Sequence, residues 1–227
     1  MSENKQCIAL ISGGIDSPVA IARMLSDGWN MQCVHFNHEE IVGDKPLNRA
    51  VKSLQHLLKI NGRIGDFARE LINPELIVVD VSNQLSKFTE KWAHTEYFIH
   101  MKRMFHRIAD NIGKELGATH ILTGENLGQV SSQTLGNIGA IEKMTDLIPL
   151  RPLLTMDKRH IIEMARELGT YRLSVGEEIC DAFGPKKPTT VANKEWLELS
   201  EQRAGGMDNL VNSALETKYS INLTNLT

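Results

Sequence analysis

Short apolar runs alternate with longer amphipathic stretches along most of the chain. The apolar runs are typical of buried strands and cover residues 7–11, 31–36, 76–81, 120–124 and 147–152. Apolar residues recur near the helical period at residues 18–27, 47–60, 89–116 and 157–168. Strand and helix in alternation predict a parallel sheet with right-handed crossovers. We therefore expect a doubly wound α/β fold with a mostly parallel, five-stranded sheet.

The pattern changes near the C-terminus. Residues 176–190 are rich in Gly, Pro and Lys, a helix is expected at 193–203, and the rest is a polar tail. No second hydrophobic core is evident. We therefore expect one domain, with residues 1–175 as its main body and residues 176–227 as a cysteine-bearing loop and a C-terminal helical extension.

Composition narrows the function classes. The chain has 227 residues, 41% of them hydrophobic, and a formal net charge of -3, so no overall positive field indicates a nucleic-acid partner. Any polyanion must be bound by a local patch. The N-terminus lacks the apolar run of a signal peptide, and no run is long enough for a membrane span. We expect a cytoplasmic protein with no membrane contact.

The first predicted strand runs into the sequence SGGIDS at residues 12–17, followed by Pro18 and a helix. Glycines at a helix N-terminus let backbone N–H groups approach an anion, and Ser17 before Pro18 is typical of a helix cap. An ordinary strand-to-helix turn would look similar. Asp16 favours a nucleotide, because a carboxylate beside phosphate needs a divalent cation between them.

Four stretches carry a resemblance to known enzymes. SGGIDS resembles the pyrophosphate loop of the ATP pyrophosphatases, the PP-loop superfamily. TGENLGQVSSQT at 123–134, RPLLTMDK at 151–158, and Glu178 to Cys180 with residues 185–190 resemble the tRNA 4-thiouridine synthases, the sulfurtransferases also known as ThiI. The resemblance covers residues 7–195. It implies an ATP pyrophosphatase domain with the adenine nucleotide alpha-hydrolase-like fold.

The resemblance also implies roles for individual residues. Asp16 is expected to hold Mg²⁺, Lys158 to neutralise the α-phosphate of ATP, and Cys180 to take part in sulfur transfer. The other expected nucleotide contacts belong to the SGGIDS loop, the end of the second strand and the TGENLGQVSSQT stretch: Ser12, Gly13, Gly14, Ser17, His35, Phe36, Gly124, Glu125, Gln129 and Gln133. Cys7 and Cys33 lie in apolar strand patterns and are interpreted as buried small hydrophobes.

Several of these features have simpler explanations that stay open. The SSQT sequence at 131–134 could only cap a helix, and Lys158 could be a solvated surface lysine. Lys102, Arg103 and Arg107 could form a solvated basic face or contact phosphate or tRNA. A metal site formed by His35, His38, Glu39 and Glu40 is disfavoured because no recognised ligand spacing is present.

The resemblance implies ATP-dependent adenylation of a tRNA uridine, followed by sulfur transfer that gives 4-thiouridine and releases pyrophosphate and AMP. These synthases usually carry a THUMP RNA-binding domain, and some carry a rhodanese domain; this sequence shows neither. We therefore expect tRNA to bind directly or through a separate subunit, and sulfur to come from a donor protein or inorganic sulfide. A homodimer, a small-molecule reaction such as sulfur transfer toward the thiamine thiazole, and a nucleotide-binding regulatory role stay open.

Overall fold

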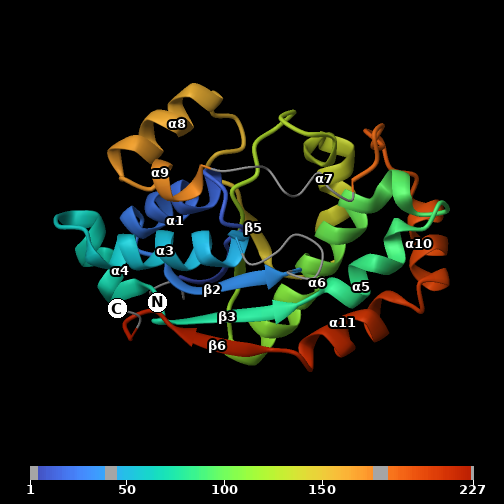
Figure 1. The fold of residues 1–227 in the computed structure, drawn as a ribbon, viewed down its shortest axis with the longest axis horizontal. Helices are drawn as coiled ribbons and strands as arrows, with labels where there is room; N and C mark the ends of the chain where they lie inside the picture. Colours follow the sequence, from blue (N-terminus) through green and yellow to red (C-terminus); the bar gives the residue numbers. More distant parts are fainter. Residues whose placement is uncertain (1–4, 39–44, 176–183, 226–227) are drawn as a thin grey trace.

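The computed structural model describes residues 5–38, 45–175 and 184–225. Its strands form one sheet in the order β5-β4-β1-β2-β3-β6 (Figure 1). The strands are β1 (Gln6–Leu10), β2 (Asn30–Asn37), β3 (Glu75–Asp80), β4 (His120–Leu122), β5 (Ile148–Leu150) and β6 (Tyr219–Asn222). Strands β1 to β5 run parallel to one another, and β6 is antiparallel to β3. The expected doubly wound, mostly parallel α/β fold is confirmed.

The expected number of strands was wrong by one. All five predicted strands are present, but the sheet has a sixth, β6, in what looked like a polar tail. Tyr219 and Ser220 of β6 are exposed, so this edge strand has no clear apolar alternation. Its place depends on pairing with β3, which is distant in sequence.

Helices flank the sheet on both sides. They are α1 (Asp16–Ser26), α3 (Lys45–Lys59), α4 (Arg63–Leu71), α5 (Ser82–Ser86), α6 (Tyr97–Leu116), α7 (Leu135–Glu142), α8 (Lys158–Glu167), α9 (Tyr171–Ser174), α10 (Lys194–Arg203) and α11 (Met207–Leu215). The long helix predicted at 89–116 begins only at Tyr97, after two 3₁₀ turns, η1 (Lys87–Thr89) and η2 (His94–Glu96). No helix among the described residues is long and apolar enough to cross a membrane.

Alternating strand residues build two hydrophobic cores, one on each face of the sheet. Cys7 and Ala9 of β1 pack with the layer that contains α1, α3, α4 and α8, whereas Ile8 packs with α6 and α11. Cys7 and Cys33 are both fully buried, as expected for small hydrophobes. Burial raises the pKa of the Cys7 thiol to about 12, so it stays protonated at neutral pH.

The strand order places the candidate motifs together. The sheet grows from β1 in two directions, toward β2 on one side and β4 on the other. Loops that follow adjacent parallel strands on either side of such a switch point face a common crevice. The SGGIDS loop follows β1 and the TGEN sequence follows β4, so sheet topology makes neighbours of two distant stretches.

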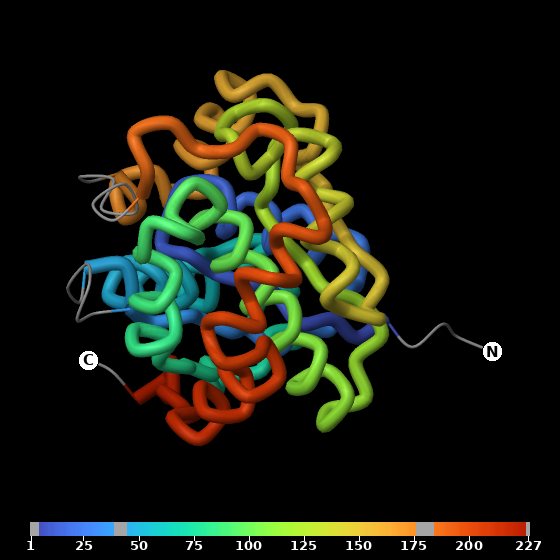
Figure 2. The backbone as a smooth tube through the Cα atoms, turned by 90° about the vertical axis from the view of Figure 1, so that its right-hand side faces the viewer, coloured from blue at the N-terminus to red at the C-terminus, as the bar shows by residue number. Residues whose placement is uncertain are grey.

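The C-terminal segment packs against the main body. Figure 2 shows α10 and α11 running down one side of the molecule before the chain enters β6. Helix α11 packs on α6 and β3. Residues 184–225 therefore extend the core and the sheet, whereas the division at residue 175 stays a prediction.

Candidate active site

The SGGIDS loop is held in a tight conformation. Gly13 has a φ of 79°, and a Cβ placed there would lie 2.3 Å from the carbonyl oxygen of Pro46. Only glycine fits at position 13, because the loop backbone there lies in close contact with the backbone of Pro46 at the start of α3. The Ser12 backbone N–H donates to Ser17 Oγ at 3.3 Å, and the Gly14 N–H donates to Ser12 Oγ at 3.3 Å. Both serines therefore shape the loop from within.

Helix α1 begins inside this loop without a side-chain cap. The helix starts at Asp16, and the capping position, Ile15, offers no side-chain hydrogen bond. The prediction that Ser17 caps the helix was wrong, since Ser17 is the second helical residue and is buried. The first N–H groups of α1 have no helical carbonyl to bind, and the helix end carries partial positive charge. This terminus is suited to an anion.

Asp16 and Lys158 meet although they are far apart in sequence. Lys158 Nζ lies 2.6 Å and 2.9 Å from the two carboxylate oxygens of Asp16. Lys158 is the first residue of α8, which Asp157 caps by accepting a hydrogen bond from the Arg159 N–H. The ammonium is therefore not an isolated surface charge: it faces a carboxylate at the start of α1.

The TGEN sequence packs directly on the SGGIDS loop. A Cβ at Gly124 would lie 2.9 Å from the carbonyl carbon of Asp16 and from the Ser17 nitrogen, so this contact also requires glycine. Asn126 Nδ2 donates to the carbonyls of Leu153 at 2.8 Å and Met156 at 2.6 Å. These bonds join the TGEN sequence to the RPLLTMDK segment. Three of the motifs singled out in the sequence thus form one site.

Glu125 lies in a buried ion-pair network instead of facing open solvent. Its carboxylate is 2.9 Å from Lys102 Nζ and 2.7 Å from Arg151 Nε, and Arg151 also pairs with Glu142. Burial raises the pKa of Glu125, but Lys102, His106 and Arg151 outweigh it and lower that pKa to about 2. The carboxylate is ionised at any working pH and ties α6 to the ends of β4 and β5.

The family follows from a match over most of the chain. The model of the family described as "Thiamine biosynthesis protein (ThiI)" matches residues 2–204. The chain belongs to the ThiI family.

Individual relatives and one solved structure agree. A protein of Acetivibrio thermocellus described as a probable tRNA sulfurtransferase is 32% identical over 226 residues, which are 99% of this chain and 55% of that protein. One from Staphylococcus aureus strain JH1, with the same description, is 32% identical over 96% of this chain and 51% of its own length. A solved 4-thiouridine synthetase in complex with RNA and bound ATP has a TM-score of 0.85 and 31% identity, covering 96% of this chain and 55% of that one. The chain thus spans about half the length of these relatives.

Two further nucleotide contacts expected for a ThiI family member lie in the loop after β4. Gln129 is exposed, and Gln133 lies in a 3₁₀ turn, η3 (Ser131–Gln133), where its Oε1 is buried without a partner among the described residues. Thr134 caps α7 by accepting from the Asn137 N–H. The helix-capping interpretation of this stretch is therefore confirmed for Thr134, and contact of Gln129 and Gln133 with ATP stays a prediction.

His35 and Phe36 are turned into the protein. His35 Nδ1 lies 2.7 Å from the carbonyl oxygen of Ile11, the residue before the SGGIDS loop, and the Phe36 ring stacks on Phe105. Both side chains are buried, and desolvation lowers the pKa of His35 to about 4. The neutral imidazole is hydrogen-bonded to the residue before the loop and so supports the loop's position. Contact of His35 and Phe36 with adenine stays a prediction.

Some of the candidate residues from the sequence lie outside the part of the chain that the structure describes. Cys180 lies outside the described residues, as do Glu39 and Glu40 of the disfavoured metal site. Within residues 5–38, 45–175 and 184–225, no cluster of three or more His, Cys, Asp or Glu side chains could hold a metal ion. Beyond the cysteine loop, the Thr189 N–H donates to the Thr95 carbonyl and Thr189 Oγ1 to Glu96. These bonds fix the chain after Cys180 to η2.

The basic residues of α6 form no open surface. Lys102 pairs with Glu125, Arg107 pairs with Asp208, and Arg103 lies 2.5 Å and 3.0 Å from the carboxylate oxygens of Glu201. Arg103 is only 6% exposed. The interpretation of Arg103 as part of a solvated basic face was wrong, and these ion pairs argue against the phosphate contact as well.

Proposed function

We propose that this chain is the catalytic part of an ATP-dependent tRNA sulfurtransferase that converts a tRNA uridine to 4-thiouridine. The observation that carries the proposal is the backbone match, at a TM-score of 0.85 and 31% identity, to a 4-thiouridine synthetase solved with RNA and bound ATP. The curated relatives described as probable tRNA sulfurtransferases support it.

The geometry of the loop after β1 supports a role in holding the triphosphate of ATP. Gly13 adopts a backbone conformation that favours glycine, and the start of α1 has no side-chain cap to occupy its N–H groups. Ser12, Gly13, Gly14 and Ser17 would hold the pyrophosphate part. Asp16 would hold Mg²⁺, which prefers carboxylate oxygen and, when bound, neutralises charge on the phosphates.

Lys158 would supply positive charge where negative charge develops during the reaction. In the proposed first step, the O4 atom of uridine attacks the α-phosphate of ATP, and the bond to pyrophosphate breaks. The α-phosphate gains negative charge in the transition state, and an ammonium placed beside it lowers the barrier. Lys158 now pairs with Asp16. With ATP bound, the ammonium would exchange this carboxylate for phosphate oxygens, and Asp16 would be left to hold the metal ion.

Sulfur transfer completes the reaction. A sulfur nucleophile attacks C4 of the adenylated uridine, and AMP leaves with the original O4 atom. We assign the sulfur chemistry to Cys180, with a donor protein or inorganic sulfide as the source, and tRNA held by this chain or by a separate RNA-binding part. We also propose a cytoplasmic location.

The proposal is tested by incubating the purified chain with unmodified tRNA, ATP, Mg²⁺ and sulfide, then measuring 4-thiouridine in digested RNA by mass spectrometry. We expect product from the unmodified sequence and at least about a hundredfold less from Asp16→Asn, since loss of one preorganised charge typically costs that much. Asp27→Asn, at the exposed C-cap of the same helix, is the matched control. Turnover unchanged by Asp16→Asn would contradict the assigned role.

Two further assays test the role of Cys180 and the identity of the substrate. Cys180→Ser is assayed with sulfide and with a persulfide donor, and we expect loss with the persulfide donor. The family description also names thiamine biosynthesis, so sulfur transfer toward the thiamine thiazole is the second candidate. Pyrophosphate release with a thiazole precursor but not with tRNA would favour it.

A further inference from the structure

Helix α3 belongs to a stretch of sequence with an unusual charge pattern. Residues 45–63 contain five Lys or Arg residues and no Asp or Glu, although acidic residues outnumber basic ones over the whole chain, 28 to 25. The five are Lys45, Arg49, Lys52, Lys59 and Arg63. Such a local excess is what an overall acidic protein needs to bind a polyanion.

Two of these lysines face solvent beside a contact between helices. Lys52 and Lys59 are exposed and lie on α3 about 10 Å apart along the axis. Between them, His56 Nε2 lies 2.7 Å from the carbonyl oxygen of Leu168, and its ring lies directly under Gly169. The two lysines therefore flank the point where α3 meets the junction of α8 and α9.

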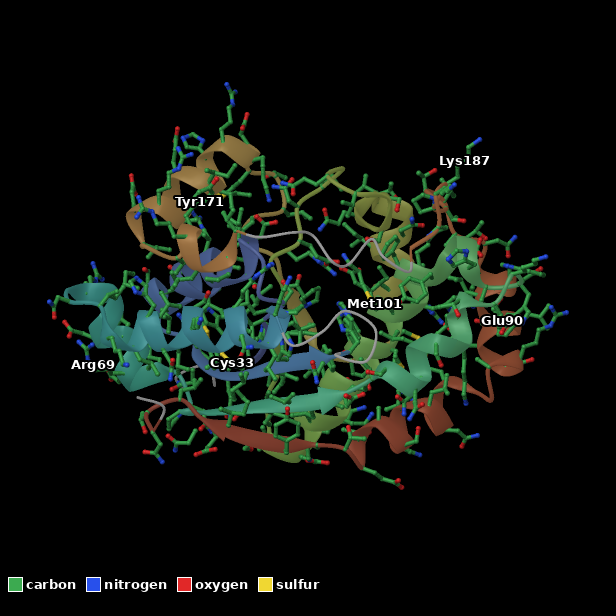
Figure 3. All side chains as sticks on the ribbon, viewed as in Figure 1. Cys33, Arg69, Glu90, Met101, Tyr171 and Lys187 are labelled. Carbon is green, nitrogen blue, oxygen red and sulfur yellow. The ribbon has the colours of Figure 1, made fainter. Side chains whose placement is uncertain are left out.

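That junction carries two arginines around a shallow pocket. The pocket has a volume of about 430 Å³ and is lined by Arg166, Gly169, Tyr171 and Arg172. The Arg166 guanidinium lies 4.9 Å from the centre of the Tyr171 ring, which is labelled in Figure 3. Among the residues that the structure describes, no carboxylate lines this pocket, although α8 carries exposed Glu163 and Glu167 nearby in sequence.

Four cations lie on the helices that meet at this junction, and together we call them the basic face: Lys52, Lys59, Arg166 and Arg172. None of the four has a carboxylate within ion-pair distance among the residues that the structure describes. Helix α9 packs against α3, so the lysines and arginines belong to one continuous layer, seen at the left of Figure 1.

Both main helices of this layer begin at the candidate active site. Helix α3 starts where Pro46 meets Gly13 of the SGGIDS loop, and α8 starts at Lys158, which pairs with Asp16. A large substrate that places one base at this site would therefore have the rest of its chain close to α3, α8 and α9.

The composition of the surface favours nucleic acid over a protein partner. Protein interfaces are centred on apolar and aromatic side chains. None of the large apolar side chains that the described residues expose at 36% or more lies on α3. Cations with one accessible ring are instead typical of contacts to phosphates and unpaired bases.

We propose that the basic face binds the phosphate backbone of the RNA substrate and guides its uridine into the candidate active site. This proposal rests on the proposed function and adds a second contact region, on the catalytic part of the protein itself. Tyr171, held by Arg166, provides a ring against which a sugar or base can pack.

The experiment measures the affinity of the chain for unmodified tRNA across a range of salt concentrations. The test variant is Lys52→Gln with Lys59→Gln. The control is Lys91→Gln with Lys143→Gln, which removes the same charge from exposed lysines elsewhere. Lys91 follows Glu90, which Figure 3 labels at the opposite side of the molecule from Tyr171.

We expect the test variant to bind tRNA about tenfold more weakly at low salt, with the slope of log affinity against log salt reduced by about two units. The control should change neither quantity. Equal effects of both variants would overturn the proposal, because they would reflect net charge alone. Arg172→Gln should weaken binding in the same direction.

Separate readouts distinguish this proposal from the proposed function. Unchanged tRNA affinity and salt slope in the test variant, while the unmodified chain makes 4-thiouridine, would overturn the basic face and leave the chemistry intact. Loss of activity only with a protein sulfur donor, at unchanged tRNA affinity, would instead assign the face to an acidic protein. If the unmodified chain binds no tRNA, the basic face is overturned, and ATP binding and thiolation assays judge the chemistry.

Discussion

Helices α3 and α6 both carry several basic residues, yet the structure treats them in opposite ways. On α6, Lys102, Arg103 and Arg107 each pair with a carboxylate, and Arg103 is buried. On α3, Lys52 and Lys59 are exposed and have no carboxylate partner among the described residues. Positive charge on a helix indicates a polyanion site only when tertiary contacts leave it unmatched.

The largest expected effect is on α6. Arg103→Met should destabilise the protein by about 3–5 kcal/mol, because the buried Glu201 carboxylate would lose its arginine and keep only the His100 imidazole as a partner among the described residues. Chemical denaturation measures the free energy of unfolding. The double variant Arg103→Met with Glu201→Leu should recover much of the loss, and failure to recover it would contradict the buried-pair explanation.

Glu125→Gln should have the next largest effect, destabilising the protein by about 3 kcal/mol. The substitution keeps the shape of the side chain but leaves Lys102 and Arg151 without their shared carboxylate. Thermal unfolding with and without ATP checks the result. Since Gly124 next to it packs on the SGGIDS loop, the Michaelis constant for ATP should also rise. An unchanged melting temperature would count against the network.

Acid should weaken the protein through its buried histidines, one of which lies on α6. His106 of α6 is fully buried, and desolvation lowers its pKa from 6.5 to about 4. Between these values only the unfolded chain takes up the proton, so this stability is complete above pH 6.5 and falls by about 1.4 kcal/mol per pH unit toward pH 4. His35, with its pKa also near 4, adds to the slope. Denaturation at several pH values should give a shallower slope for His106→Gln, and identical slopes would contradict this cause.

Arg107→Ala should cost less than about 1 kcal/mol. Its partner Asp208 is 76% exposed, so water screens the pair and replaces it when the arginine is lost. The matched comparison with Arg103 on the same helix isolates the effect of burial. A loss as large as that of Arg103→Met would overturn this distinction.

The smallest change in stability is expected for Lys52→Gln with Lys59→Gln, within about 0.5 kcal/mol of the unmodified chain. Both side chains are exposed, and the substitutions remove no ion pair that the structure describes. A stability loss above about 1 kcal/mol would mean that these lysines support the fold, and the contrast between α3 and α6 would fail.

Much of the fold could be predicted because the signals are local. The runs IAL in β1 and LIVV in β3 and the amphipathic period of α3 depend on nearby residues alone. Strand β6 and the broken start of the helix at 89–116 could not be predicted, since both depend on partners distant in sequence. The acid-free run at 45–63 was visible in the sequence, but its exposure was not.

The candidate site shows the same division. The residue types in SGGIDS, TGEN and RPLLTMDK predicted nucleotide chemistry, and glycine at positions 13 and 124 matches close backbone contacts found in the structure. The sequence did not reveal that Lys158 lies within hydrogen-bond distance of Asp16 or that Glu125 is enclosed by cations.

The sequence by itself thus determined the layer architecture, the loops that bear the chemistry and the ThiI family resemblance. Hydrophobic periodicity and loop residues act over a few positions, so one chain is enough to show them. Only the tertiary structure decided which charges are matched: Arg103 is buried against Glu201, while Lys52 is exposed. Electrostatic environment depends on burial and on neighbours brought together by folding, and the linear order of residues contains neither directly.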